Sequence, residues 1–280
     1  MNKYGLIGHP LGHSMSPLIH EKLFALSGIT DYSYELIDIA PENLAENADM
    51  LRELRGFNIT IPHKMAVIPM TNELDESALR YNSVNCISND NGIMTGYNTD
   101  CFGFVLSAEN ENLPLDKKVL LLGCGGVGRM IAIESALHGA ELTIAVIPQD
   151  IKTAELAMAE ILDKCDNASV KICLISEIEG NFDLLVNATP VGMYPKCDAC
   201  AVSDEIIENC ANVFDVIYNP VETLLMKKAR AMGKKAVGGA AMLVYQAVKA
   251  HEIWYGGKFD VADINVIIKA VEDEVSKMNK

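Results

Sequence analysis

The chain has 280 residues, of which 50% are hydrophobic and 22% charged, and its formal net charge is −15. This composition is ordinary for a globular protein, and the length suits one large or two medium domains. An acidic chain repels phosphate backbones, so nucleic acid is not an expected partner. No apolar run is long enough to span a bilayer, and the N-terminus lacks the apolar core of a signal peptide. We therefore expect a cytoplasmic protein with no membrane partner.

The first hundred residues predict alternating strands and helices. Ser16-Pro17 predicts a helix N-cap followed by proline at the first helical position, and Gly28 closes that helix. Asn89-Asp90-Asn91 predicts the turn of a hairpin. The predicted strands are Lys3–Gly8, Tyr32–Asp38, Gly56–Ile61, Val84–Ser88 and Gly92–Tyr97, and a second helix is predicted over Pro41–Leu54.

Asn98-Thr99-Asp100 caps a predicted helix that runs to about Glu109 and is a natural bridge between domains. From Lys118 the pattern changes to the alternation that is typical of a parallel sheet. Strands are predicted at Lys118–Leu122, Glu141–Ile147, Val170–Ile175, Asp183–Asn187, Val213–Val216 and Lys235–Val237, and helices at Gly126–His138, Ile151–Lys164, Val221–Met232, Gly238–Trp254 and Val261–Met278.

A glycine-rich loop lies between the first strand and the first helix of this second half. Gly123-Cys124-Gly125-Gly126-Val127-Gly128 fits G-x-G-x-x-G in the context that the motif requires. Such glycines allow a tight turn and close approach of a pyrophosphate, whose charge the helix N-terminus stabilises. A purely structural turn is the alternative, and the context favours dinucleotide binding.

The end of the next strand should show which dinucleotide binds. An acidic residue there is typical of NAD sites, and an arginine nearby is typical of NADP sites. The strand ends in Ala145-Val146-Ile147-Pro148-Gln149, which contains neither; Asp150 and Lys152 come later.

Four polar clusters occur in the first half. Ser14 and Ser16 lie in a loop that enters a helix, where hydroxyls and free N–H groups suit a carboxylate. Lys64 follows a strand, Asn85 begins one, and Asp100 begins a helix. Capping, a turn or a solvated surface charge would explain each one alone. Together they supply the ammonium, carboxylate, amide and hydroxyl groups for oxidising a secondary alcohol beside a carboxylated ring.

These motifs resemble the shikimate dehydrogenase family over nearly the whole chain. In order, the matches are Gly5-Leu-Ile-Gly8 with His13-Ser-Met-Ser-Pro17, Asn58-Ile-Thr-Ile-Pro-His-Lys64, Ser83-Val-Asn-Cys86, Gly96-Tyr-Asn-Thr-Asp100, the glycine loop, Asn187-Ala-Thr-Pro-Val-Gly-Met193, Asp215-Val-Ile-Tyr-Asn-Pro220 and Gly238-Gly-Ala-Ala-Met-Leu-Val-Tyr-Gln246.

The resemblance implies an α/β protein with two domains and a cleft between them. Residues 1–101, closed by helices in 238–280, would form the substrate domain, and residues 102–237 the Rossmann-type NAD(P) domain. The implied catalytic pair is Lys64 and Asp100. The implied substrate ligands are Ser14 and Ser16 for the carboxylate, Thr60, Asn85, Asn98 and Gln246 for the ring hydroxyls, and Tyr218 nearby. The implied coenzyme contacts are Gly123, Gly125, Gly126, Val127, Gly128, Thr189, Met193 and Gly239.

The implied reaction is the reversible NADPH-dependent reduction of 3-dehydroshikimate to shikimate, an oxidoreductase step of aromatic amino-acid biosynthesis. The family commonly has Asn-Arg-Thr where this chain has Val146-Ile147-Pro148, and that arginine holds the 2′-phosphate. The resemblance implies NADP as the coenzyme, and because this chain lacks the arginine, NAD is not excluded. The protein would be a monomer or a homodimer.

Two other functions remain open at this point. A quinate/shikimate dehydrogenase that uses NAD is the nearer one, although Ser16 favours shikimate, because quinate enzymes often have threonine near that position. The other is a non-catalytic ligand-binding protein on the same fold, against which the presence of both Lys64 and Asp100 argues.

The chain has eight cysteines without a framework spacing, which we expect to be reduced thiols. Cys197 and Cys200 form a C-x-x-C pair. A zinc site would need Cys210 and a distant histidine in addition, so a surface loop is the favoured interpretation and no metal is predicted.

Overall fold

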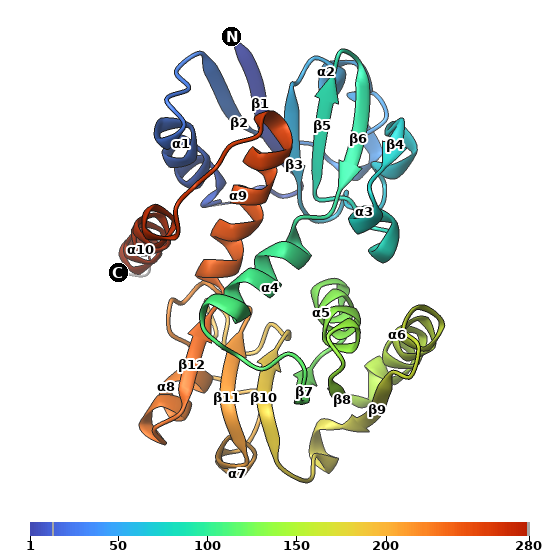
Figure 1. Ribbon diagram of the computed structural model, residues 1–280, viewed down its shortest axis with the longest axis vertical. Helices are drawn as coiled ribbons and strands as arrows, with labels where there is room; N and C mark the ends of the chain where they lie inside the picture. Colours follow the sequence, from blue (N-terminus) through green and yellow to red (C-terminus); the bar gives the residue numbers. More distant parts are fainter. Residues whose placement is uncertain (13, 279–280) are drawn as a thin grey trace. The chain divides into compact units, whose positions relative to one another are not determined.

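The computed structural model describes residues 1–12 and 14–278, and the chain forms two compact units (Figure 1). Unit 1 contains Met1–Gly103 and Val244–Val271. Unit 2 contains Phe104–Leu243 and the residues from Glu272 onward. Three helices include residues of both units: α4 (Asp100–Asn110), α9 (Ala240–Tyr255) and α10 (Val261–Met278).

Unit 1 is built on a mixed six-stranded sheet with the order β2-β1-β3-β5-β6-β4. β1 is parallel to β2 and β3, whereas β5 is antiparallel to β3 and β6. The strands are β1 (Asn2–Gly8), β2 (Tyr32–Asp38), β3 (Gly56–Ile59), β4 (Glu73–Leu74), β5 (Cys86–Asp90) and β6 (Ile93–Tyr97); the helices are α1 (Ser16–Leu26), α2 (Ala48–Arg52) and α3 (Glu76–Tyr81), with short 3-10 turns η1 (Pro41–Asn43) and η2 (Ile68–Met70).

Two expectations for unit 1 were wrong. The helix predicted over Pro41–Leu54 is broken into η1 and α2. Asn47 contributes to this break, because its side-chain amide donates to the carbonyl of Asn43 at 2.9 Å and so competes with regular helical bonding. The hairpin turn lies one residue later than predicted, at Asn91 and Gly92, both of which have positive φ.

Unit 2 is a parallel six-stranded sheet with the order β12-β11-β10-β7-β8-β9. Read from the β9 edge and numbered along the chain, this is the Rossmann order 3-2-1-4-5-6. The strands are β7 (Lys118–Leu122), β8 (Glu141–Val146), β9 (Ser169–Leu174), β10 (Phe182–Asn187), β11 (Cys210–Asp215) and β12 (Lys235–Gly238); the helices are α5 (Gly126–Leu137), α6 (Ile151–Lys164), α7 (Asp204–Glu208) and α8 (Leu224–Ala231), with 3-10 turns η3 (Pro148–Asp150) and η4 (Ile175–Glu177).

The predicted α/β class with a Rossmann-type half is therefore confirmed. The strand order of unit 2 reverses between β7 and β10, which lie side by side in the sheet. In open α/β sheets, ligands bind beyond the carboxyl ends of the strands at such a switch point. The glycine loop follows β7 and Thr189 follows β10, so both lie at this point.

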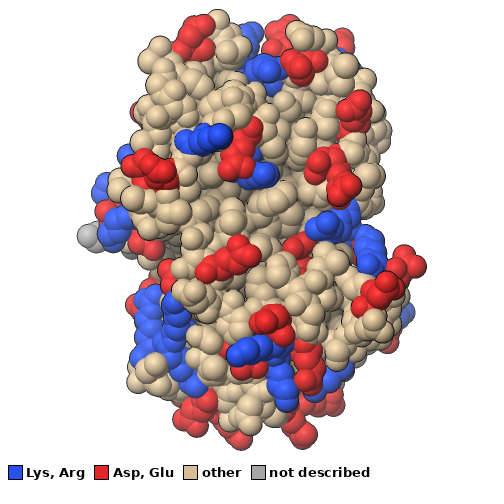
Figure 2. Space-filling model, viewed as in Figure 1, with Lys and Arg blue, Asp and Glu red and all other residues tan. Residues whose placement is uncertain are grey.

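Acidic and basic side chains are interspersed over the described part of the face in Figure 2. A nucleic-acid site would need a basic stripe, so this face offers no support for one. Among residues 1–12 and 14–278, no helix combines the length and the apolar character needed to cross a membrane.

Candidate active site

Three predicted residues meet at one end of the unit 1 sheet. Lys64 follows β3, Asn85 precedes β5 and Asp100 begins α4 after β6. Lys64 Nζ lies 2.5 Å from Asp100 Oδ2, and Asn85 Nδ2 donates to Asp100 Oδ1 at 2.8 Å. The side chains of Lys64 and Asp100 retain 25% and 18% exposure, so the pair is sheltered but reachable. Each carboxylate oxygen of Asp100 thus has its own donor.

Backbone and side-chain bonds hold this pair in place. The Thr99 N–H donates to Asn85 Oδ1 at 2.6 Å, and Asn85 Nδ2 lies 3.0 Å from the Thr99 hydroxyl. The Thr99 hydroxyl is also 3.4 Å from Gln246 Oε1. Thr99 is fully buried and was not among the predicted site residues. Its position inside a Tyr-Asn-Thr-Asp segment was the only available signal.

Asn98 supports the start of α4. Its Oδ1 accepts the N–H of Asp100 at 3.1 Å, and its Nδ2 donates to the Ser83 carbonyl at 3.1 Å. The capping explanation considered for Asp100 therefore belongs to Asn98, and the Asp100 carboxylate is left for Lys64 and Asn85. Thr60 lies at the same end of the sheet, where its Cγ2 would be 2.4 Å from a Cβ at Gly8.

The N-terminus of α1 differs from its prediction by one residue. Met15, not Ser16, is the N-cap, and no side chain caps that position. Ser14 Oγ accepts the N–H of Ser16 at 3.2 Å, so Ser14 has the local structural role and the buried Ser16 hydroxyl does not cap the helix. His13, which belongs to the same motif, lies outside the described residues.

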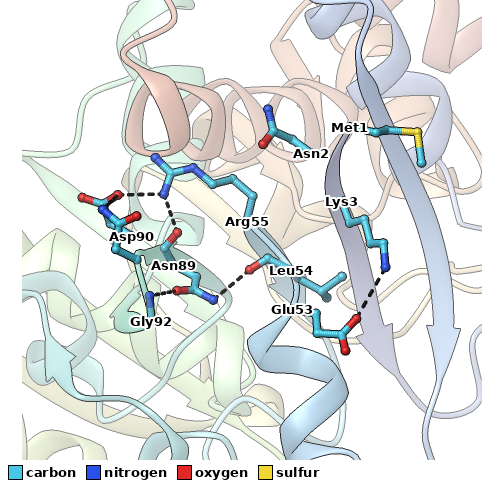
Figure 3. A pocket seen from close by; sticks show the side chains of 10 residues that line it. Met1, Asn2, Lys3, Glu53, Leu54, Arg55, Asn89, Asp90 and Gly92 are labelled. Atoms are coloured by element: carbon cyan, nitrogen blue, oxygen red, sulfur yellow. Dashed lines mark hydrogen bonds and ion pairs between the residues drawn. The ribbon is translucent and has the colours of Figure 1, made fainter.

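A pocket of about 470 Å³ lies at the opposite end of the unit 1 sheet, where β1 and β3 begin (Figure 3). Lys3 pairs with Glu53 at 3.5 Å, and Arg55 pairs with Asp90 at 3.0 Å. The charges drawn there satisfy one another, and none of the predicted site residues lines this pocket. It is not the candidate site.

The glycine loop of unit 2 has the geometry that its motif predicts. Gly123 has φ +82°, and a Cβ there would lie 2.8 Å from Thr189 Cγ2. A Cβ at Gly128 would lie 2.5 Å from the Gly123 carbonyl oxygen, so only glycine allows helix α5 to pack so closely. Gly125 and Gly126 are exposed and have nothing within 4 Å of a Cβ position. This leaves the backbone N–H groups beside Val127 open to an anion.

The loop after β10 is supported by a buried polar network. Both the N–H and the hydroxyl of Thr189 donate to Asn187 Oδ1, at 3.1 and 2.7 Å. Asn187 Nδ2 donates to Asp215 Oδ1 at 3.1 Å, and the Thr223 hydroxyl donates to Asp215 Oδ2 at 2.7 Å. Burial raises the pKa of Asp215 to about 6, although these donors act against the shift.

The other predicted unit 2 residues lie around the ends of β10 and β11. Met193 is 46% exposed. Tyr218 is half-buried, and burial raises its pKa. Gly239 packs against the loop after β11, because a Cβ there would lie 2.1 Å from the Val216 carbonyl oxygen.

The end of β8 is apolar, and Arg129, which follows the glycine loop in α5, is engaged in an ion pair. Val146 is buried, while Ile147 is 41% exposed. Arg129 in α5 binds Glu160 in α6 through two bonds, at 2.6 and 2.7 Å. Burial raises the pKa of Cys124, in the glycine loop, to about 11. The positive charge of Arg129 acts against this shift, and the negative charges of Asp150 and Glu160 add to it. Lys152, which follows β8 in the sequence, is exposed.

Cys197 and Cys200 are half-buried free thiols. Among residues 1–12 and 14–278, no three His, Cys, Asp or Glu side chains gather in a way that could hold a metal ion.

Comparison with known proteins identifies the family. Residues 6–87 match the family model for the shikimate dehydrogenase substrate binding domain. The chain is 38% identical over 262 residues to shikimate dehydrogenase (NADP(+)) of Caldanaerobacter subterraneus, with 92% of each sequence covered.

Two solved structures are similar over almost the whole chain. A shikimate dehydrogenase in complex with NADP+ has a TM-score of 0.89 and 35% identity, and 98% of this chain and 96% of that one are covered. Shikimate 5-dehydrogenase from Listeria monocytogenes, in complex with shikimate and NAD, has a TM-score of 0.86 and 29% identity, with 95% and 96% covered. On the evidence of the motifs, the two sheets and these relatives, the chain belongs to the shikimate dehydrogenase family.

Proposed function

We propose that this protein catalyses the reversible NADP-dependent reduction of 3-dehydroshikimate to shikimate. The observation that carries the proposal is the arrangement of Lys64, Asp100 and Asn85. It places a proton donor, a carboxylate and an amide within hydrogen-bonding distance of one another and keeps the charged pair accessible. The alternatives of an NAD-linked quinate enzyme and a non-catalytic binding protein are not favoured, because the relatives are NADP-dependent dehydrogenases.

Unit 2 fits a dinucleotide. The open Cβ positions at Gly125 and Gly126 leave room for a pyrophosphate, and the start of α5 supplies N–H donors and a positive dipole end. We assign Gly123, Val127 and Gly128 to the same loop, and Thr189, Met193 and Gly239 to the nicotinamide side. Bound NADP would supply the hydride that reduces the substrate carbonyl.

The residues of unit 1 handle the proton and the substrate. As the carbonyl carbon is reduced, its oxygen becomes an alkoxide that needs a proton, and we assign its delivery to the Lys64 ammonium group. Asp100 accepts a hydrogen bond from the same hydroxyl and holds the ammonium group toward it. In the reverse direction Lys64 takes the proton back.

The remaining assignments concern substrate binding. Ser14 and Ser16 hold the carboxylate near the N-terminus of α1, where N–H groups favour an anion. Thr60, Asn85, Asn98 and Gln246 bind the ring hydroxyls, and Tyr218 lies near the substrate. Asn98 keeps both of its structural bonds in this role, because its amide nitrogen has a second proton.

We assign substrate binding to residues 1–101 with the helices of 238–280, and coenzyme binding to residues 102–237. We place the enzyme in the cytoplasm, where its free cysteines would stay reduced. As a monomer or a homodimer, it would need no partner other than its substrate and coenzyme.

The test is turnover of shikimate with NADP and with NAD, assayed side by side, and of quinate with both. We expect oxidation of shikimate with NADP to be the fastest reaction. Faster turnover of quinate would support the quinate alternative, and absence of turnover with every combination would support the non-catalytic one.

A further inference from the structure

Asp38 lies beside the start of the loop that connects β1 to α1. It is the last residue of β2 and pairs in register with Gly8, the last residue of β1. Because β1 is parallel to both β2 and β3, Asp38 lies at the same end of the sheet as the loop after β3, which carries Lys64. The loop after β1, residues 9–15, contains Ser14 and leads into α1. Asp38 therefore adjoins the loop that we assign to the substrate carboxylate.

Both carboxylate oxygens of Asp38 bind this loop. Oδ1 lies 2.6 Å from Nδ1 of His9, and Oδ2 accepts the N–H of Leu11 at 2.7 Å. These bonds lower the pKa of Asp38, with His9 making the larger contribution, so the carboxyl group is ionised at neutral pH. An ionised carboxylate can only accept hydrogen bonds, so the hydrogen between Asp38 and His9 is on Nδ1. We call these two bonds the Asp38 clasp.

Residues 9–12 have few other anchors. The backbone N–H of His9 donates to the Ile61 carbonyl at 3.0 Å, and the Leu11 side chain packs against the end of β1. Within residues 1–12 and 14–278, no hydrogen bond of residues 9–12 goes to any partner other than Ile61 and Asp38. Without the Asp38 clasp, one hydrogen bond and one apolar contact would hold this segment to the sheet.

The serine hydroxyls come directly after this anchored segment. Ser14 comes three residues after Leu11, and its Oγ accepts the N–H of Ser16 at 3.2 Å. Ser16 is buried and begins α1, so the helix fixes its position, whereas Ser14 is only half-buried. The position of Ser14 therefore depends on where residues 9–12 are held. A loop held less firmly must be ordered by the ligand, which lowers the affinity.

The charge of Asp38 acts against an anionic substrate. A negative charge at this end of the sheet repels a carboxylate, so a neutral residue would favour shikimate binding on electrostatic grounds alone. The side chains of Asp38 and His9 are 46% and 43% exposed, so water and salt screen this repulsion. The hydrogen bonds of the Asp38 clasp are directional and remain. An aspartate at this position is therefore explained by its two acceptor oxygens and not by its charge.

We propose that Asp38 is a positioning residue for substrate binding, which holds the loop after β1 through His9 and Leu11 so that Ser14 meets the substrate carboxylate. This deepens the function proposed above and rests on it. Asp38 acts through the loop and not on the reacting atoms. Its loss should therefore raise the KM for shikimate and leave kcat and the Kd for NADP unchanged.

The experiment compares Asp38→Ala with Asp38→Asn. Asp38→Ala removes both bonds of the clasp, so the KM for shikimate should rise roughly three- to tenfold, even though a repelling charge is lost. Asp38→Asn removes the same charge but keeps an oxygen for Leu11, and its amide N–H can donate to Nδ1 of the other His9 tautomer. Its KM should stay within about twofold of wild type, since a difference of one weak bond is of that order. Asp90→Ala is the matched control, because it removes an ion-paired aspartate at the opposite end of the sheet.

A second variant tests the other side of the clasp. His9→Ala removes one of the two bonds, so it should raise the KM for shikimate less than Asp38→Ala does, and the double variant should be no worse than Asp38→Ala alone. His9→Ala also provides the test if Asp38→Ala does not fold, which fluorescence of the buried Trp254 would reveal.

Three outcomes would overturn the positioning role of Asp38. They are a KM for shikimate at or below the wild-type value in Asp38→Ala or His9→Ala, an equal weakening of NADP binding, and an Asp38→Asn variant that is as impaired as Asp38→Ala. Wild-type protein that fails to oxidise shikimate would instead overturn the proposed function.

Discussion

The two units prepare their candidate sites in opposite ways. In unit 1, side chains bind one another before any ligand is present: Lys64, Asp100 and Asn85 are joined by bonds of 2.5 and 2.8 Å. In unit 2, the glycine loop offers backbone and open space, and the nearby Arg129 is bound to Glu160. The proposed catalytic chemistry would therefore depend on a few specific side chains, whereas the proposed coenzyme binding would depend mainly on positions that have no side chain.

The pKa values of two buried histidines in unit 1 and of one buried aspartate in unit 2 are shifted in opposite directions. In unit 1, burial lowers the pKa of His20 to about 3, and His251, 2.8 Å from it, is shifted well below its ordinary value. In unit 2, burial raises the pKa of Asp215 to about 6. The two histidines are therefore neutral at neutral pH, whereas Asp215 takes up a proton only near pH 6, so acid should act on the two units in opposite directions.

The largest expected effect on activity comes from removing the ion pair between Lys64 and Asp100. Lys64→Ala should lower kcat by about 10²–10⁴-fold, the usual contribution of a general acid–base group. Lys228→Ala is the matched control, because Lys228 also lies 2.5 Å from a carboxylate, that of Asp204, on the surface of unit 2. Near-normal turnover by Lys64→Ala would remove the role assigned to it.

The next largest effect should come from removing the serine hydroxyls assigned to the substrate carboxylate. Ser14→Ala and Ser16→Ala should each weaken shikimate binding by about 1.5–3 kcal/mol, the value of a hydrogen bond to a charged group, and leave the Kd for NADP unchanged. Titrations with both ligands measure this. Ser27→Ala, at the other end of α1, is the control. Equal weakening of shikimate binding and NADP binding would contradict the assignment of these serines to the substrate. It would also mean that the two units do not bind their ligands separately.

Acid should weaken unit 1. Below pH 6.5 the unfolded chain protonates His20, while the folded chain does not until about pH 3, so stability falls as the pH falls. One such histidine costs about 2 kcal/mol between pH 7 and pH 5. Asp215 acts in the opposite sense, because its folded form takes up a proton near pH 6, before the unfolded form does.

Trp254 is the single tryptophan of the chain and is buried in unit 1, so its fluorescence during denaturant unfolding reports on that unit. The difference in stability between pH 7 and pH 5 should shrink in His20→Gln. A wild-type unfolding midpoint that is the same at both pH values would contradict the expected cost.

The smallest effect should be a gain in NADP affinity from a substitution at the end of β8. Ile147→Arg should tighten NADP binding by about tenfold, or ~1.4 kcal/mol, with little change for NAD, because a guanidinium group can bind the 2′-phosphate through two parallel bonds. Leu156→Arg adds the same charge at an exposed position of α6 and should change neither affinity.

The preference of the wild-type protein for NADP over NAD tests the same region, the end of β8. Val146, Ile147 and Pro148 cannot bind the 2′-phosphate, and Lys152 is a flexible point charge, so we expect weak preference for NADP over NAD. A thousandfold preference in kcat/KM, about 4 kcal/mol, would mean that the phosphate has partners outside the β8 end.

Local patterns were enough to predict most elements of both units. Tyr32–Asp38, Lys118–Leu122, Ile151–Lys164 and Val261–Met278 have the bounds that their periodicity predicted. The prediction of one helix over Pro41–Leu54 was wrong, because the apolar spacing there fits two short helical segments as well as one continuous helix. Short elements such as α3 and α7 had too few residues to show a period.

By itself, the sequence determined the family motifs, the Rossmann half and the missing arginine after β8, because each depends on residues that are neighbours along the chain. Only the tertiary structure decided that Asp100 is shared between Lys64 and Asn85 and that Arg129 is held by Glu160. These contacts join residues 15 to 36 positions apart on different elements. No periodicity encodes them, since they follow from the way the strands and helices of each unit pack.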